Sequence, residues 1–244
     1  MGKTAALLLV TGLLGIVPAI LAGTMPATET KTVTVTPSHY DAFWLWSGRR
    51  LPGGLPAIRT LYLHQGEVLN LHGKAVFMRQ GQPVASVKAT HIWLTVRLET
   101  LALPDDQIGR MVNLLLRWKK AGNHVVGLQL DFDAATGRLA EYGVFLQRVR
   151  AKMPADFALG VTGLLDWAQT GSVAQLNLLP IDEIVVQTYQ GKRTVPGYQR
   201  YLPALQGLHI PFRIGLVENG NWGDMPGEVR DSAWFRGYVV FLVQ

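Results

Sequence analysis

The chain has no cysteine among its 244 residues. Disulfides, thiol nucleophiles, thiolate metal ligands and a lipid anchor on cysteine are therefore excluded. No histidine pair or histidine–carboxylate cluster has the spacing of a metal site, so we predict neither a metal nor another cofactor. The sequence also lacks a glycine-rich phosphate loop and a serine in a nucleophile-elbow context.

Charged residues are sparse, at 16% of the chain, and the formal net charge is +6. The basic residues are scattered, and the longest runs are the pairs Arg49-Arg50, Lys119-Lys120 and Lys192-Arg193. Because no basic stripe carries interleaved aromatics, we predict that nucleic acid is not a partner. The charge suits a solvated surface in an envelope rich in anionic polymers, and we expect a monomer.

The amino terminus has the plan of an export signal. One basic residue, Lys3, precedes an apolar run over 5–22. This pattern predicts that residues 1–23 form either a signal peptide or an uncleaved membrane anchor, since the length of the apolar run is at the lower limit for spanning a bilayer. The Thr-rich stretch 24–37 resembles a tether, and 38–244 would form one domain. We expect an exported protein that is periplasmic, anchored in the inner membrane or secreted.

Short apolar strands recur from Tyr40 onward, and amphipathic helices lie between the later ones. The predicted strands are 41–46, 60–64, 91–98, 125–133, 157–165, 183–189, 212–218 and 238–243. The predicted helices are 104–122, 138–152, 173–178, 198–205 and 228–235. This α/β alternation favours a (β/α)₈ TIM-type barrel, irregular in its first third, where loops and a hairpin around His72-Gly73 replace helices. An open doubly wound sheet is the alternative.

The strand 125–133 carries the strongest functional signal. Leu128, Leu130 and Phe132 alternate with Gln129, Asp131 and Asp133. Two carboxylates on one face lie about 6.6 Å apart along a strand, close enough for each to perturb the pKa of the other. A functional site is favoured over a structural carboxylate pair, because perturbed groups cluster at sites.

Active sites of such barrels lie at the carboxyl ends of the strands, and this rule selects the other candidates. The candidate polar residues are Arg97, Glu99, Asp166, Gln187, Tyr189 and Glu218. Four tryptophans could stack on sugar rings: Trp44, Trp46, Trp167 and Trp222. The alternatives are that Trp44 and Trp46 are packing residues, that Arg97 neutralises Asp131, and that His64 is structural.

The stretch Gly127–Asp133 resembles the strand-four signature Asp-Gly-x-Asp-x-Asp-x-Glu of the chitinase-like glycoside hydrolases of family eighteen. Gln129 and Asp131 align with the two inner aspartates, and Asp133 aligns with the catalytic glutamate. Gln187-Thr188-Tyr189 resembles that family's Met-x-Tyr, whose tyrosine orients the acetamido group of the substrate. Asp133 is one methylene shorter than glutamate, and Gln129 cannot take up a proton.

A whole-domain resemblance is to a bacterial family known as domain of unknown function 3142. Its members look like exported barrels with four short motifs. The matching segments here are Gln129–Asp133, Arg138–Tyr142, Thr162–Trp167 and Gln187–Tyr189. This resemblance implies a barrel and export, and it implies no particular activity.

Two functions remain open. In the first, the protein is a glycoside hydrolase acting on an envelope or extracellular polysaccharide, including one that contains N-acetylhexosamine. Asp133 would be the general acid and Asp131 would settle its proton. The stabiliser would be an acetamido group held by Tyr189 and Gln187, or Asp166 or Glu218 across the barrel. In the second, the barrel binds carbohydrate without catalysis.

Overall fold

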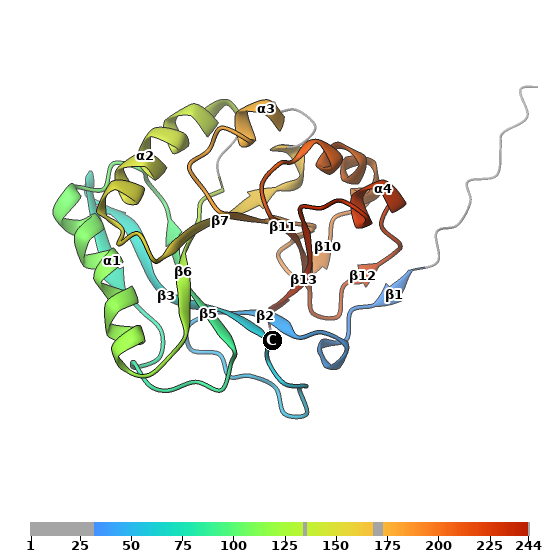
Figure 1. The fold of residues 1–244 in the computed structure, drawn as a ribbon, viewed down its shortest axis with the longest axis horizontal. Helices are drawn as coiled ribbons and strands as arrows, with labels where there is room; N and C mark the ends of the chain where they lie inside the picture. Colours follow the sequence, from blue (N-terminus) through green and yellow to red (C-terminus); the bar gives the residue numbers. More distant parts are fainter. Residues whose placement is uncertain (1–31, 134–135, 168–172, 244) are drawn as a thin grey trace, which may run out of the picture. The chain divides into compact units, whose positions relative to one another are not determined.

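Eight parallel strands close into a barrel in the computed structural model, which describes residues 32–133, 136–167 and 173–243 (Figure 1). In order around the barrel they are β2 (Ala42–Leu45), β3 (Thr60–Leu71), β5 (His91–Leu98), β6 (Val125–Asp131), β7 (Ala158–Leu164), β8 (Glu183–Gln187), β11 (Phe212–Val217) and β13 (Phe235–Leu242). The β2 strand pairs with both β13 and β3, which completes the ring. The prediction of a TIM-type barrel is confirmed.

The helices lie outside the strand ring (Figure 1). They are α1 (Asp105–Lys120), α2 (Leu139–Lys152), α3 (Val173–Leu176) and α4 (Gly227–Arg230), with 3₁₀ segments η1 (Pro37–His39), η2 (Thr136–Arg138), η3 (Leu165–Trp167) and η4 (Tyr198–Gly207). Two predicted helices differ. The segment from Tyr198 is a 3₁₀ helix that contains Pro203, whose missing N–H prevents regular helical bonding. The last helix ends at Arg230, before strand β13 begins.

The first third departs from the repeat as predicted, because a hairpin takes the place of a helix. The long β3 strand pairs in antiparallel fashion with β4 (Lys74–Arg79). His72 and Gly73 form the turn with φ of 51° and 81°. Two successive positive φ angles match the twist of the flanking strands, and this geometry favours glycine at the second position. No helix lies between β2 and β3.

Two hydrophobic layers hold the barrel together. The outer layer lies between the strands and the helices, where Ile108, Met111, Leu115 and Trp118 of α1 are buried. The inner layer fills the barrel with large aromatics from β2, β3, β5 and β13, namely Trp44, Tyr62, Trp93 and Phe241. Glycines face these rings: a Cβ at Gly160 would meet Trp93 at 3.1 Å, and one at Gly215 would meet Phe241 at 2.8 Å. Large rings opposite glycines fill the lumen without overpacking.

Residues 1–31 lie outside the described part of the chain, and so does most of the expected tether. The last residues of the expected tether are part of the folded domain instead. β1 (Val33–Thr34) pairs with β12 (Asn221–Trp222), and Val35 is buried in the outer core. The chain is therefore packed against the barrel from residue 33 onward. Among the helices that the structure describes, none has the length and apolar character needed to cross a bilayer.

Candidate functional site at the barrel mouth

The alternation along β6 directs the predicted polar residues inward, as the sequence indicated. Leu128 and Leu130 are fully buried in the outer core, and Phe132 packs on Tyr142 with ring centroids 5.2 Å apart. The opposite face places Gln129 and Asp131 on the barrel side, next to Arg97 across the β5–β6 pairing. The strand ends at Asp131, so Asp133 lies beyond it at the mouth, the end of the barrel where the strands finish.

Asp131 is the buried member of the pair, with 6% of its surface exposed. It accepts hydrogen bonds from the Thr162 hydroxyl of β7 and, at 3.5 Å, from the Gln187 amide of β8. Burial is the largest effect on this carboxyl and raises its pKa from 3.8 to about 6, with a further rise from the charge of Asp133. The hydrogen bonds and Arg97 oppose the rise in pKa without cancelling it. Asp131 is therefore a carboxyl that keeps its proton up to about pH 6, well above the range of an ordinary aspartate.

Asp133 has a different environment, because 61% of its side chain is exposed. The Arg97 guanidinium lies 3.8 Å from its Oδ2 atom and 5.9 Å from the centre of the Trp46 ring. Arg97 thus forms its ion pair with Asp133 and not with Asp131, the partner that the sequence alternative assigned to it. An exposed pair at this distance contributes little to stability, so it leaves Asp133 available to a ligand.

A pocket of about 520 Å³ opens beside the carboxyl pair. Its polar lining consists of Asp133, Asp166, Gln187, Tyr189, Gln190 and Tyr201. Burial, followed by the charges of Asp131 and Asp133, raises the pKa of Tyr189 well above its ordinary value. Its hydroxyl is therefore protonated and can donate a hydrogen bond to a ligand. The Tyr189 ring is fixed by Phe241, with the centroids 4.9 Å apart.

The four predicted tryptophans divide into one at the mouth and three in the core. Trp46 is partly exposed and lies over Trp44 with ring centroids 4.4 Å apart. Trp44 is fully buried inside the barrel, and Trp167 is buried against Tyr142 in the outer core. Trp222 stacks on Tyr198 at 4.6 Å and is 6% exposed. Only Trp46 of the four therefore offers an indole face at the mouth. The expectation of sugar stacking on the other three is corrected, because packing covers their rings.

Two predicted carboxylates lie apart from the pocket. Glu99 is exposed, and its carboxylate accepts a hydrogen bond from the backbone N–H of Asn70 at 3.1 Å. This hydrogen bond stabilises the part of β3 that extends beyond the barrel. Glu218 is half-buried after β11 and is not part of the lining of the pocket beside Asp133. Asp166 is thus the predicted carboxylate that the fold brings to the same pocket as Asp133.

A polar layer crosses three adjacent strands beneath the mouth. Residues His64, Thr95 and Gln129 face one another in register on β3, β5 and β6. The Trp44 indole N–H donates to Gln129 Oε1 at 2.9 Å, and this fixes the amide orientation because an indole can only donate. Gln129 Nε2, Thr95 Oγ1 and His64 Nε2 are buried and have no hydrogen-bond partner among the residues that the structure describes. Gln129 therefore acts from inside the barrel and not as a direct ligand contact.

Period-two alternation places Thr162 and Thr95 on the inner face of their strands, but the sequence assigned neither a role, and it left Tyr201 out of the site. Tyr201 lies on η4, and no sequence pattern signalled its approach to the pocket. Burial lowers the pKa of His64, which accordingly stays neutral, with its Nδ1 atom 2.7 Å from the Ser47 hydroxyl. Across residues 32–133, 136–167 and 173–243, no three His, Asp or Glu side chains are grouped so as to hold a metal ion.

Comparison with protein families gives one match. Residues 89–199 match the model of a family described as domain of unknown function (DUF3142). The matched stretch runs from the start of β5 into η4 and includes Arg97, Asp131, Asp133, Gln187 and Tyr189. The match supports the resemblance to that family. It does not extend to the chitinase-like glycoside hydrolases, whose similarity remains a resemblance of two motifs. No curated protein matches the chain.

Proposed function

We propose that the barrel mouth binds a saccharide chain of an envelope or extracellular polysaccharide and hydrolyses a glycosidic bond in it. The observation that carries the proposal is the carboxyl pair. Asp131 has a pKa raised to about 6, and Asp133 lines the adjoining pocket. A general acid needs a carboxyl that keeps its proton at the working pH, and burial supplies one here up to about pH 6.

In the proposed reaction Asp131 holds the proton. Asp133 relays it to the glycosidic oxygen, since Asp131 is too buried to touch a ligand. The bond from that oxygen to the anomeric carbon breaks, and a water molecule adds its hydroxyl there. Asp166, on the same pocket, is the candidate to accept the proton of that water.

The rest of the pocket provides groups that suit a polyhydroxylated ligand. The Tyr189 hydroxyl donates and the Gln187 amide both donates and accepts. Outside the pocket lining, Trp46 presents an indole face beside Arg97. Such a mixture of aromatic surface and a few directed polar groups is typical of sites for small polar ligands.

The test is a hydrolysis screen of neutral and acidic polysaccharides with the wild-type protein, Asp133→Asn and Asp166→Asn. Loss of a general acid lowers turnover by about 10²-fold or more, so Asp133→Asn should retain binding and lose cleavage. Wild-type activity should fall as pH rises through about 6, because Asp131 then releases its proton. Full activity of Asp133→Asn on a substrate that the wild type cleaves would overturn the assignment.

A second function is favoured by one specific observation. The Arg97 guanidinium lies 3.8 Å from Asp133 Oδ2, so the exposed carboxyl of the pair already has a cationic partner, and the two side chains together offer donors and acceptors to sugar hydroxyls. On this basis the mouth would bind saccharide without cleaving it. Binding that depends on Trp46 and Tyr189, with no product formed from any substrate screened, would support this second function over hydrolysis.

A further inference from the structure

We propose that a basic pocket behind the β9–β10 hairpin is a subsite for an anionic group on the saccharide chain, so that the ligand is an acidic polysaccharide. The hairpin joins β9 (Tyr189–Gln190) to β10 (Arg193–Thr194) and so begins with the mouth residue Tyr189. The inference rests on the proposed function for the identity of the ligand as a saccharide. The pocket itself has separate support.

The pocket has a volume of about 490 Å³ and an entirely uncharged or basic lining. Lys192 and Arg193 are its two charged residues, and no Asp or Glu contributes to it. Both cations are exposed, and neither forms an ion pair or a side-chain hydrogen bond within the part of the chain that the structure describes. Two adjacent cations without a counter-charge raise the local concentration of anions.

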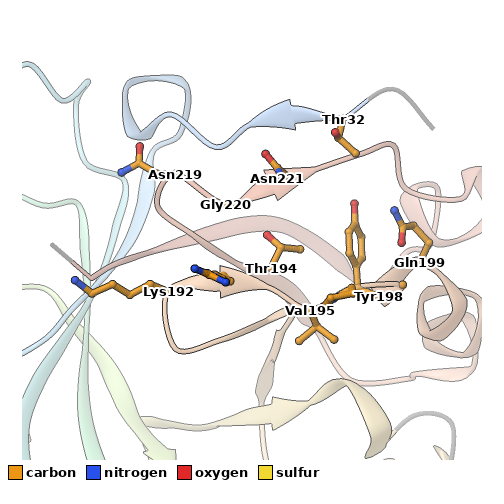
Figure 2. Close-up of a pocket in the computed structure, with 12 residues that line it drawn as sticks. Thr32, Lys192, Thr194, Val195, Tyr198, Gln199, Asn219, Gly220 and Asn221 are labelled. Atoms are coloured by element: carbon orange, nitrogen blue, oxygen red, sulfur yellow. The ribbon is translucent and has the colours of Figure 1, made fainter. Parts of the chain in front are cut away.

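Neutral donors surround the two cations. Figure 2 shows Thr194 on β10, Asn221 on β12 above it, and Tyr198 to the right of both. The Tyr198 oxygen accepts the backbone N–H of Gly223 at 2.6 Å, so its own hydrogen remains free to donate. The β10 strand and the segment that leads into β12 approach closely at Gly220, where a Cβ would lie 2.6 Å from Thr194 Oγ1. Guanidinium, ammonium, hydroxyl and amide donors together match the oxygens of a carboxylate, sulfate or phosphate.

Two acidic residues lie near the pocket without lining it. Glu218 precedes Asn219 in the turn after β11, and Asp224 is close enough to raise the pKa of Tyr198. The positive charge of Arg200, which lies beside the lining residue Gly197, opposes the negative charges of these two residues. The charge at the pocket itself therefore remains positive.

The position of the hairpin links this pocket to the mouth. Gln190 and Gly191 line the pocket beside Asp133, and the next three residues, 192–194, line the basic pocket. Val195 lines both. A saccharide chain held at the carboxyl pair would thus continue past the hairpin, where an acidic substituent meets Lys192 and Arg193.

The experiment measures binding of three tetrasaccharides by titration calorimetry: tetragalacturonate, its neutral methyl ester, and a sulfated maltotetraose. The double variant Lys192→Gln/Arg193→Gln removes the pocket's charge. The matched control is Lys74→Gln/Arg79→Gln, which removes one lysine and one arginine from the exposed β3–β4 hairpin. Thermal unfolding checks that both variants fold.

We expect the wild type and the control to bind at least one charged tetramer about tenfold or more tightly than the neutral one, and the pocket variant to lose that preference. The preference should also weaken with added salt, because the cations are exposed. Preference for tetragalacturonate identifies a uronate substituent, and preference for the sulfated chain identifies a sulfate-like one. Equal binding of charged and neutral chains by the wild type, or equal losses in the control, would overturn the subsite.

Two further outcomes separate this inference from the proposed function. If the pocket variant alone loses the charge preference while the wild type cleaves no saccharide, hydrolysis fails and the subsite stands. If a short single-stranded DNA binds as tightly as the charged tetramers, the assignment to acidic saccharide is wrong.

Discussion

Replacing Asp131 by Asn should stabilise the protein at neutral and alkaline pH. Folding raises the pKa of this carboxyl from 3.8 to about 6, chiefly through burial. At low pH Asp131 is protonated in both the folded and the unfolded states, so this carboxyl does not lower the free energy of unfolding. As pH rises from about 4 to about 6, the unfolded chain releases its proton while the folded protein keeps it, so the free energy of unfolding falls.

The size of this effect follows from the shift. Two pKa units at about 1.4 kcal/mol each give a loss of about 3 kcal/mol above pH 6. The amide that replaces the carboxyl cannot ionise, retains nearly the same shape and can still accept the Thr162 hydroxyl. We therefore expect Asp131→Asn to match or fall below the wild type near pH 4 and to exceed it by up to about 3 kcal/mol at pH 8. For a chain of this size the gain corresponds to about 6–12 °C in Tm.

Urea denaturation of both proteins between pH 4 and pH 8 measures the effect. All other titrating groups are common to the two proteins, so the difference between their unfolding free energies isolates Asp131. Asp133→Asn is the matched control, since its side chain is 61% exposed and should yield a much smaller gain. A difference that stays constant with pH would refute the reasoning. A gain would show that the protein keeps Asp131 despite its effect on stability, as expected for a functional group.

Three other predictions concern the architecture of the barrel. Gly127→Ala should destabilise the barrel by about 1–3 kcal/mol or more in chemical denaturation, since its Cβ would lie 1.9 Å from the Ala158 carbonyl oxygen. The control is Gly109→Ala in α1, where a Cβ has open space, and it should stabilise the protein by about 0.5–1 kcal/mol in the same series. Arg213→Met should cost about 3–5 kcal/mol in that assay, because it leaves the Glu183 carboxylate, now 3.0 Å from the guanidinium, buried without its cation; a loss below about 1 kcal/mol would contradict this. A high-resolution crystal structure should show ordered water within hydrogen-bond distance of the polar layer, and a dry layer would contradict the cost assigned to unpaired buried groups. The atoms concerned are His64 Nε2, Thr95 Oγ1 and Gln129 Nε2.

Local patterns in the sequence predicted the barrel well. Strand positions follow from period-two alternation and from the turn residues that bound each run, and both are properties of short segments. The His72-Gly73 turn illustrates this, because the positive φ angles that a tight hairpin needs favour glycine at the second position. The departures are the 3₁₀ form of the segment from Tyr198, which contains Pro203, and the positions of element ends. The last helix stops at Arg230, and β6 stops at Asp131.

The end of β6 explains why the alternation could not show which of the two aspartates is buried. Asp131 and Asp133 share a face and lie two residues apart, so alternation treats them alike. The hydrogen-bonded strand finishes at Asp131, and only the residue inside it is buried between β5 and β7. Strand ends are set by the neighbouring strands and by barrel closure, which single-strand patterns do not contain.

The same argument separates the tryptophans. Trp44 lies on β2, and Trp46 follows the end of that strand two positions later; Trp44 is fully buried, whereas Trp46 is partly exposed at the mouth. Their difference is depth along the barrel axis, and depth depends on the register of each strand against the next. Register also aligns His64 with Thr95 and Thr95 with Gln129, although 65 positions separate the first from the last. The alternation around a polar residue therefore predicts on which side of the strand its side chain lies. Closure of the barrel decides whether that side chain contacts a ligand, a core aromatic or another polar group.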